Sequence, residues 1–315
     1  MRAWADEVPR GWLEAVHGGP RGTDAPELDF SVNVNPFAPT PGVAEVLSSL
    51  PVRHYPDPLS LGPRRAGGRL WKVGTDQIRF GAGANELLHR VALAWLRPGE
   101  VGVVPEPAFS EYGRAIRLAR GRLARVAPRD DDGALDLGGL LEVARREEAR
   151  LVYLALPNTP TGEALSRDAV EDVRRELPEA CLLVLDESFR AFQEGTVAAP
   201  PLLGIRSGVV TVRSVTKDCG LAGLRAGFAM GPVSILAALD RVGVPWSASV
   251  AAQEAARISL EEEGARYLDE TLARVRRETR LMERAFREMK LVPRPTAANF
   301  HCLRPGRASA FADAL

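Results

Sequence analysis

The chain has 315 residues, of which 45% are hydrophobic and 26% charged, a composition typical of a globular protein with one large domain and a smaller one. Its 41 basic residues balance 41 acidic ones, so no long-range field favours nucleic acid or an anionic membrane as partner. The apolar runs are too short to span a bilayer and the first twenty residues lack a signal-peptide core, which predicts a cytoplasmic protein.

Helical patterns alternate with strand-like apolar runs through the first two thirds of the chain. In chain order we expect a helix at 86–96, a strand at 101–104, a helix at 135–146, a strand at 151–156, a helix at 168–177, and strands at 181–185 and 209–212. Strands separated by helices predict an α/β fold with a mostly parallel sheet covered on both faces. Ligands of such sheets bind beyond the carboxyl ends of the strands.

The pattern becomes helical after about Val233. Residues 252–290 form a long charged amphipathic stretch, which is expected to contain a helix that links the two domains, and residues 291–292 and 299–303 predict the first strands of the smaller one. We therefore expect a large domain at 36–245 and a small α/β domain made of 1–35 and 246–315. The first forty residues, rich in Gly and Pro, are expected to run across the active site or a subunit boundary.

Lysine is scarce, because the 41 basic residues include only Lys72, Lys217 and Lys290. Arginine serves where only charge is needed, whereas only lysine can lose its proton and attack a carbonyl. Lys72 and Lys290 lie in polar stretches and are expected at the surface. Lys217 follows a strand and is the candidate for chemistry. The three cysteines and four histidines show neither a disulfide framework nor metal-ligand spacing.

The segment around Lys217 carries the strongest chemical signal. Ser214 and Thr216 precede the lysine, and Arg225 follows it within a Gly-Leu-Arg-Ala-Gly stretch. This set suits a phosphate ester that bears an aldehyde: Arg225 would pair with the phosphate, the two hydroxyls would donate to it, and Lys217 would form an imine. A solvated basic loop at a strand end is the other interpretation of the segment alone.

The arrangement resembles fold-type-I pyridoxal-phosphate (PLP) enzymes of the class I/II aminotransferase family. Within that family it is similar to histidinol-phosphate aminotransferases and to the threonine-phosphate decarboxylases of cobalamin synthesis. The matching segments follow in order along nearly the whole chain. The resemblance implies a PLP-binding large domain, a smaller α/β domain, and pyridoxal 5′-phosphate joined to Lys217.

The resemblance also implies roles around the cofactor ring. Asp186 matches the aspartate beneath the pyridine nitrogen, where a carboxylate keeps that nitrogen protonated. Asn158 matches the asparagine that hydrogen-bonds the ring hydroxyl oxygen, and Phe109 the aromatic residue that stacks on the ring, with Tyr112 as the neighbouring alternative. Phe189 stands where many histidinol-phosphate aminotransferases have a tyrosine, so one hydrogen bond to the ring oxygen is missing.

Two further segments match the phosphate end of the cofactor site. Residues 81–86 precede a predicted helix, so the backbone N–H groups of Ala84 and Asn85 are expected to approach the phosphate. Tyr55, in Tyr-Pro-Asp-Pro, resembles the tyrosine that reaches the cofactor phosphate of the neighbouring subunit. That match implies a homodimer with composite active sites.

The substrate implied is a small amino acid, phosphorylated in both of these branches. His17 before two glycines, together with Asn33 and Asn35, makes up the candidate substrate contacts. Val34 replaces the glutamate usual in histidinol-phosphate aminotransferases, which favours the threonine-phosphate decarboxylase interpretation. Transamination of the histidinol-phosphate type is the alternative. A catalytically silent PLP-binding module and a doubly wound nucleotide-binding protein are the alternatives from other classes.

The end of the chain affects the expected substrate affinity. Relatives continue past the segment that resembles residues 298–300 and supply arginines for the substrate's carboxylate and phosphate, whereas this sequence ends at Leu315. Arg304 and Arg307 do not match those arginines. We therefore expect an incomplete small domain, in a truncated chain or one that holds substrate differently, and weak substrate affinity.

Overall fold

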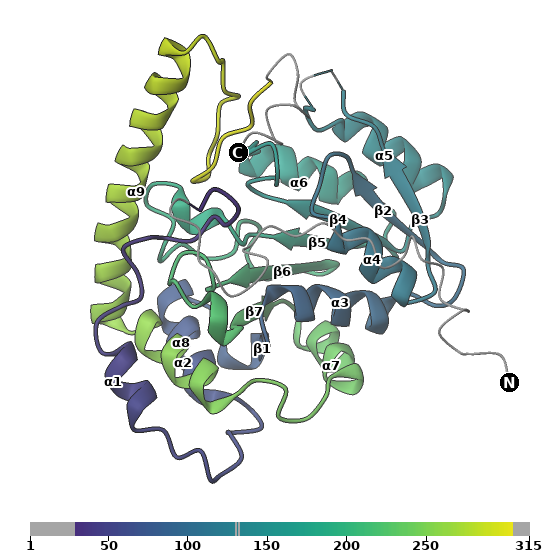
Figure 1. Cartoon of the computed structure of the whole chain (residues 1–315). Helices are drawn as coiled ribbons and strands as arrows, with labels where there is room; N and C mark the ends of the chain where they lie inside the picture. Colours follow the sequence, from purple (N-terminus) through teal and green to yellow (C-terminus); the bar gives the residue numbers. More distant parts are fainter. Residues whose placement is uncertain (1–28, 130, 132, 305–315) are drawn as a thin grey trace, which may run out of the picture.

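The computed structural model describes residues 29–129, 131 and 133–304 (Figure 1). The strands are β1 (Ile78–Gly81), β2 (Val101–Pro105), β3 (Arg122–Val126), β4 (Leu151–Ala155), β5 (Leu182–Asp186), β6 (Val209–Ser214) and β7 (Gly227–Met230). The helices are α1 (Val43–Ser48), α2 (Leu61–Trp71), α3 (Ala84–Trp95), α4 (Glu111–Leu118), α5 (Leu137–Arg146), α6 (Arg167–Glu176), α7 (Val233–Val242), α8 (Val250–Leu260) and α9 (Glu262–Glu288). Short 3-10 turns are η3 (Thr75–Gln77), η4 (Arg190–Phe192) and η5 (Ala222–Leu224).

The strands form one seven-stranded sheet in the order β1-β7-β6-β5-β4-β2-β3. The five strands from β6 to β3 are parallel, whereas β7 runs antiparallel to both of its neighbours, β1 and β6. The carboxyl ends of the parallel strands therefore meet at one edge of the sheet, where loops of different origin can converge.

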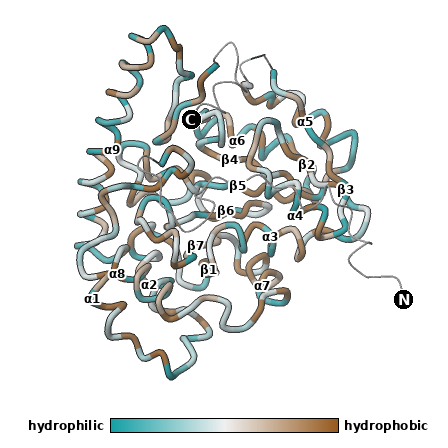
Figure 2. Tube along the Cα trace, in the orientation of Figure 1, coloured by the Kyte–Doolittle hydropathy of each residue, from teal (hydrophilic) through white to brown (hydrophobic). Residues whose placement is uncertain are grey.

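Both faces of the sheet are buried, which explains why its central strands are almost continuously apolar. In β4, Leu151 and Tyr153 pack with α3, α4 and α7, whereas Val152 and Leu154 pack with α5 and α6 on the opposite face. A third cluster joins β7 and β1 to α2, α8 and the first half of α9. Figure 2 shows the apolar residues recurring along the strands and alternating with polar ones along α9.

Side-chain caps define the start of several helices. Asp136 accepts a hydrogen bond from the Gly139 N–H at the start of α5, and Ser166 accepts from Ala169 at the start of α6. Ser249 does the same for Ala252 in α8. Each cap satisfies an N–H group that the helix itself leaves unpaired, which contributes about 1 kcal/mol.

The observed architecture confirms the predicted α/β fold with a mostly parallel sheet. The expected helices and strands of the first two thirds agree with α3, α5, α6, β2, β4, β5 and β6 to within two residues at each end. The edge strand β3, the antiparallel strand β7 and its partner β1 were not expected. Lys72 and Lys290 are exposed, as predicted.

The last third agrees with expectation in its helical stretch and differs after it. Residues 252–290 hold most of α8 and all of α9, and the two helices are separate because the backbone at Glu261 is extended (φ −71°, ψ 166°) and ends α8 there. The strands expected at 291–292 and 299–303 do not form within the described residues. Pro293 and Pro295 lack N–H groups, and the backbone bond from Arg294 to the Cys302 carbonyl is too little to build a ladder.

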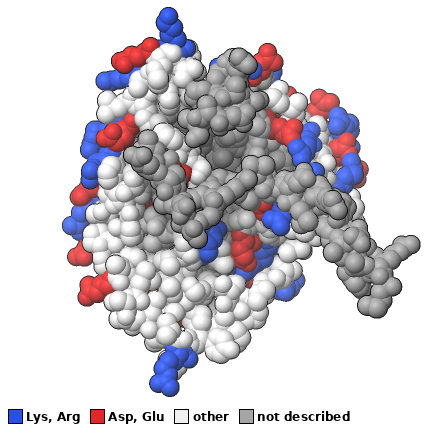
Figure 3. Space-filling view, in the orientation of Figure 1, with Lys and Arg blue, Asp and Glu red and all other residues white. Residues whose placement is uncertain are grey.

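The division into domains at 36–245 and at 1–35 with 246–315 stays a prediction. Within the described residues, no helix is both long and apolar enough to cross a membrane. On the face drawn in Figure 3, basic and acidic side chains are interspersed around the part of the surface that the figure describes.

Candidate active site

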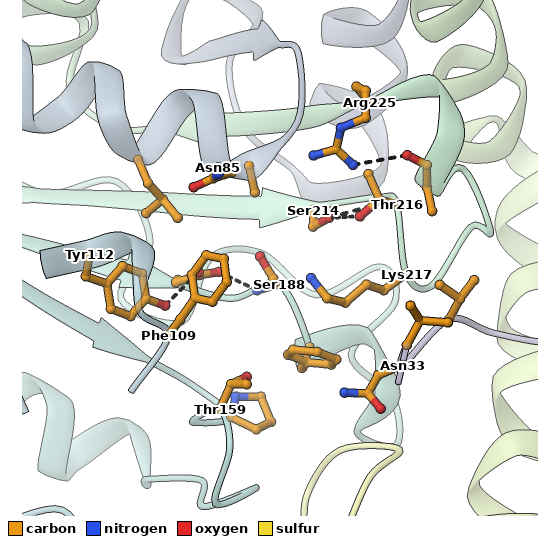
Figure 4. A pocket seen from close by; sticks show the side chains of 18 of the residues that line it. Asn33, Asn85, Phe109, Tyr112, Thr159, Ser188, Ser214, Thr216, Lys217 and Arg225 are labelled. Atoms are coloured by element: carbon orange, nitrogen blue, oxygen red, sulfur yellow. Dashed lines mark hydrogen bonds between the residues drawn. The ribbon is translucent and has the colours of Figure 1, made fainter. Parts of the chain in front are cut away.

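A cavity of about 410 Å³ lies at the carboxyl edge of the sheet (Figure 4). Its walls come from the loops after β2, β4, β5 and β6, the start of α3 and the segment before α1. The lining residues are Ser31, Val32, Asn33, Val34, Ala84, Asn85, Leu88, Phe109, Tyr112, Pro157, Thr159, Asp186, Ser188, Phe189, Ser214, Thr216, Lys217, Ala222 and Arg225. The first and last of these residues in the sequence, Ser31 and Arg225, are 194 positions apart, so distant segments of the chain meet at this cavity.

Lys217 extends into the cavity that the labelled side chains surround (Figure 4). Burial lowers the pKa of its ammonium, and nearby Arg225 adds to that effect, while Asp186 and Asp218 oppose it. Its Nζ lies 4.7 Å from the centre of the Phe189 ring. A half-buried lysine with a lowered pKa supplies the neutral amine that attack on a carbonyl requires.

Asp186 is the last residue of β5, and both of its carboxylate oxygens are held by donors. Oδ1 accepts the backbone N–H of Ser188 at 2.9 Å, and Oδ2 accepts the Tyr112 hydroxyl at 2.8 Å. The carboxylate lies on the lining with its position set from two sides (Figure 4). It is a fixed negative charge facing the same space as Lys217.

A cradle for an anionic group lies at the start of α3. Ser214 and Thr216 hydroxyls are 2.6 Å apart at the end of β6. Gly83 has φ +96°, and a Cβ at this residue would lie 2.9 Å from Arg225 Nη2, so the guanidinium covers the helix N-terminus directly. Two hydroxyls, one guanidinium and the free N–H groups of the first turn of α3 converge here, as a phosphate requires.

Phe109 lines the cavity, whereas Asn158 is not itself among the lining residues. Asn158 is fully buried between the lining residues Pro157 and Thr159. Its Nδ2 donates to the Pro107 carbonyl and to Thr161 Oγ1, each at 2.9 Å, while its buried Oδ1 lacks a partner within the described residues. Phe109 presents its ring to the cavity and meets Tyr112 edge-on, with centroids 5.6 Å apart.

The two asparagines of the N-terminal segment have different surroundings. Asn33 lines the cavity, together with Ser31, Val32 and Val34. Asn35 does not line it: the residue is 1% exposed, its N–H donates to the Lys217 carbonyl at 2.7 Å, and its Nδ2 donates to the Asp218 carbonyl and Thr271 Oγ1. Asn35 thus ties the backbone beside Lys217 to α9. His17 lies outside the described residues.

Tyr55 lies away from the cavity of its own chain. Its side chain is 81% exposed and its ring contacts Trp246, with centroids 5.0 Å apart. Trp246 lines a second hollow, together with other residues of the 57–64 and 243–253 segments. Tyr55 is not among the residues that line the cavity around Lys217.

Sequence reasoning missed several members of the site. Ser188 and Thr159 follow the predicted aspartate and asparagine by two residues and one residue, so a scan of strand-end loops would have found them. The contact between Tyr112 and Asp186 had no sequence signal, because 74 residues separate them. Sequence reasoning also missed Glu187. Its carboxylate is fully buried and pairs with Arg213 and Arg190, each at 2.7 Å, which anchors the loop that follows β5.

Comparison with known proteins identifies the family. The model of "Aminotransferase class I and II" matches residues 27–315. A histidinol-phosphate aminotransferase of Roseiflexus castenholzii is 34% identical over 303 residues, which cover 91% of this chain and 79% of the relative. That of Akkermansia muciniphila is 32% identical over 295 residues, with the same two shares of 91% and 79%.

The chain belongs to the class I and II aminotransferases. Among solved structures, the histidinol-phosphate aminotransferase of Sinorhizobium meliloti in complex with pyridoxal-5′-phosphate superposes with a TM-score of 0.82. It shares 28% sequence identity, over 90% of this chain and 77% of that one. As a member of this family, the protein is a PLP-dependent enzyme.

The residues of this class I and II aminotransferase fit pyridoxal 5′-phosphate. The anion cradle suits the phosphate of the cofactor, Lys217 suits its aldehyde, and Asp186 suits its ring nitrogen. The buried Oδ1 of Asn158, which has no partner within the described residues, is available to a polar group of the cofactor. The relatives are aminotransferases, so the comparisons favour the transaminase alternative over the decarboxylase interpretation, which finds no support among them. Within the described part of the chain, no group of acidic, Cys or His residues could hold a metal ion.

Proposed function

We propose that this enzyme transfers the amino group of a small phosphorylated amine, in the manner of a histidinol-phosphate aminotransferase. The observation that carries the proposal is the convergence of Lys217, Asp186 and the Arg225 cradle in one cavity. The aminotransferase relatives named above support the reaction type, and their common name supports a phosphorylated substrate. Decarboxylation of threonine phosphate has no such support.

When bound, the cofactor supplies an aldehyde that captures an amine and a ring that takes up electrons. We assign its phosphate to Arg225, Ser214, Thr216 and the backbone N–H groups of Ala84 and Asn85. Charge-assisted hydrogen bonds from these donors would hold the phosphate in one position. A fixed phosphate would set the distance between the ring and Lys217.

Three side chains would orient the ring. Asp186 would accept a hydrogen bond from the protonated ring nitrogen, and its negative charge would keep that nitrogen protonated. Phe109 would lie against the ring face, and Asn158 would meet the ring oxygen. Phe189 offers that oxygen no hydrogen bond, so the ring oxygen would depend on Asn158.

Lys217 has two tasks in this scheme. Its lowered pKa makes the amine available to hold the aldehyde carbon. After a substrate amine has taken its place, the same Nζ would act as general base and remove the proton from the amine-bearing carbon of the substrate. As general acid it would then deliver that proton to the former aldehyde carbon of the cofactor. Asn33, which also lines the cavity, would contact the substrate.

Two subunits would complete the site. Tyr55 is exposed, and its ring contacts Trp246. An exposed side chain in this position is available to contact a neighbouring subunit. We therefore propose a homodimer in which Tyr55 of each protomer contacts the cofactor phosphate of the other.

The proposal is tested with purified protein supplied with PLP. A visible absorbance band that borohydride removes, with a pyridoxyl mass on Lys217, is expected, and Lys217→Ala should lose both. Histidinol phosphate is then incubated with 2-oxo acids, and the amino acid product is measured by mass spectrometry. In parallel, threonine phosphate is assayed for release of CO₂.

The outcomes separate the alternatives. Amino acid formation from the 2-oxo acid supports the proposal. Release of CO₂ without amino transfer would replace it with the decarboxylase. A labelled lysine with neither product would indicate the silent PLP-binding module, and a protein that never acquires the label would remove the site assignment altogether.

A further inference from the structure

Tyr112 has no role in the function proposed above, yet its hydroxyl contacts Asp186, the carboxylate assigned to the ring nitrogen. Its hydroxyl donates to Asp186 Oδ2 at 2.8 Å, across 74 residues of sequence (Figure 4). The residue is 1% exposed, so water does not compete for this bond. Its ring edge meets Phe109, the residue proposed to face the cofactor ring.

The position of Tyr112 is held from its other side as well. Its ring stacks on Tyr153 with centroids 4.9 Å apart and an interplanar angle of 8°. Tyr153 is itself fixed, because its hydroxyl donates to the Leu88 carbonyl of α3 at 2.7 Å. The two tyrosines therefore form a rigid pair behind Asp186, and only one of them bonds to the carboxylate.

The surroundings of the Tyr112 hydroxyl favour its protonated form, in which it is a hydrogen-bond donor. Burial, and then the charge of Asp186, raise the pKa of this phenol well above its ordinary value. A hydrogen-bond donor stabilises the charged form of a carboxylate.

We propose that Tyr112 is a positioning residue that holds the Asp186 carboxylate oriented toward the cofactor's ring nitrogen. The inference rests on the proposed role of Asp186. A carboxylate held in this orientation keeps its negative charge next to the ring nitrogen and so keeps the proton there, whereas loss of the phenol would leave the carboxylate free to turn away. Tyr112 thus acts through Asp186 and does not itself contact the reacting atoms.

The chain offers a matched pair of variants. Tyr112→Phe and Tyr153→Phe each remove one buried hydroxyl from the same ring stack, but only the first removes a donor to Asp186. For each holoenzyme we would measure the pH midpoint of the visible cofactor band, the Kd of the apoenzyme for PLP, and kcat and KM separately. A thermal melt would check that both variants fold.

Tyr112→Phe is expected to raise the spectral midpoint, because a ring nitrogen with less positive charge repels a proton on the lysine-linked nitrogen less. It should lower kcat by about 10-fold or more while KM changes little, as expected when a hydrogen bond to a charged group is lost. PLP should bind more weakly. Tyr153→Phe should leave the midpoint and kcat close to those of the unsubstituted enzyme.

Asp186→Asn, alone and combined with Tyr112→Phe, separates the role of Asp186 from that of Tyr112. In the Asp186→Asn background, removal of the Tyr112 hydroxyl should have no further effect on the midpoint. If Asp186→Asn itself left the midpoint and the PLP affinity unchanged, the proposed role of Asp186 would fail and the inference with it. If Asp186→Asn shifted them but Tyr112→Phe shifted the midpoint no more than Tyr153→Phe did, the inference alone would be overturned.

Discussion

The buried carboxyl group of Asp218 makes the stability of the apoprotein depend on pH. Burial raises its pKa from 3.8 to about 6, although the Cys219 N–H and the neighbouring Lys217 and Arg213 oppose the rise. The folded state therefore prefers the protonated carboxyl. Its contribution to stability is fully present below about pH 4 and is lost as the pH rises through about 6.

Asp218→Asn should stabilise the apoprotein at pH 8 by up to about 3 kcal/mol, the value of a shift of about two pKa units. At pH 4 the gain should vanish, because the carboxyl is then protonated in the folded state. Urea unfolding at pH 4, 6 and 8 measures this directly. An equal effect at all three values would show that Asp218 does not titrate as described.

Asn33 and Asn35 should respond differently to the same substitution. Asn33→Ala removes a group from the cavity wall and should raise KM for the amine substrate without changing stability. Asn35→Ala leaves buried partners at Asp218 and Thr271 unpaired and should lower the free energy of unfolding by about 1–3 kcal/mol. Steady-state kinetics and denaturant unfolding separate the two effects, and identical behaviour would contradict this assignment.

The structure brings Lys217, Asp186 and Arg225 together in one cavity, as expected from the sequence, whereas several of their partners were not predicted. Lysine scarcity and strand-end position marked Lys217, the segment around it marked Arg225, and Asp186 followed from the family resemblance. Asn35 matched a family pattern and was expected to contact substrate, yet the structure directs its amide to the backbone beside Lys217. A side chain's direction depends on backbone angles and neighbours that the sequence does not state.

At the scale of elements, the close contact between β7 and the start of α3 makes the proposed phosphate cradle sensitive to an added side chain. A Cβ added to Gly227 would lie 2.4 Å from the Ala84 nitrogen, closer than real side chains approach a backbone. The antiparallel strand therefore needs glycine where it passes the helix N-terminus. Any larger residue would displace the N–H groups of the cradle.

Gly227→Ala should lower the free energy of unfolding by about 1–3 kcal/mol, as overpacking does, and weaken PLP binding at least tenfold. Gly223→Ala is the control, because a Cβ there meets nothing within 4 Å. Titration of each apoprotein with PLP measures the affinity. Equal affinity for the two variants would show that the cradle tolerates the shift.

Periodicity identified four of the five parallel strands, because burial on both faces makes β2, β4, β5 and β6 continuously apolar. It missed the parallel edge strand β3, whose residues are mostly exposed or only partly buried. It also missed β1 and β7, since four-residue strands such as Gly227–Met230 carry too few residues to show a period. Within the amphipathic stretch at 252–290 it did not place the break between α8 and α9, because that break is a matter of the backbone angles at Glu261.

At the scale of the molecule, one part of the surface is apolar enough to serve as an interface. Figure 3 shows few charged side chains over the lower part of the view, around α1, α2 and α8 of Figure 1. The exposed large apolar residues of the 52–59 and 244–246 segments are Val52, Tyr55, Leu59, Val244 and Trp246. A second subunit would bury them.

Trp246→Arg should therefore convert the proposed dimer to monomer and lower PLP retention, since Tyr55 would no longer reach the neighbouring site. Leu281→Arg, at a similarly exposed residue of α9, should leave the dimer intact. Sedimentation equilibrium at several concentrations gives the masses. A monomeric unsubstituted enzyme with full PLP affinity would rule out the composite site.

The wall formed by residues 31–34 belongs to none of the helices or strands, and it joins the rest of the site through Asn35, on the very backbone that carries Lys217. In the proposed function, substrate contact by residues 31–34 and proton transfer by Lys217 would therefore lie on separate stretches of polypeptide. Substitutions in the four-residue wall would then change which amine is accepted while Lys217 and Asp186 stay in place.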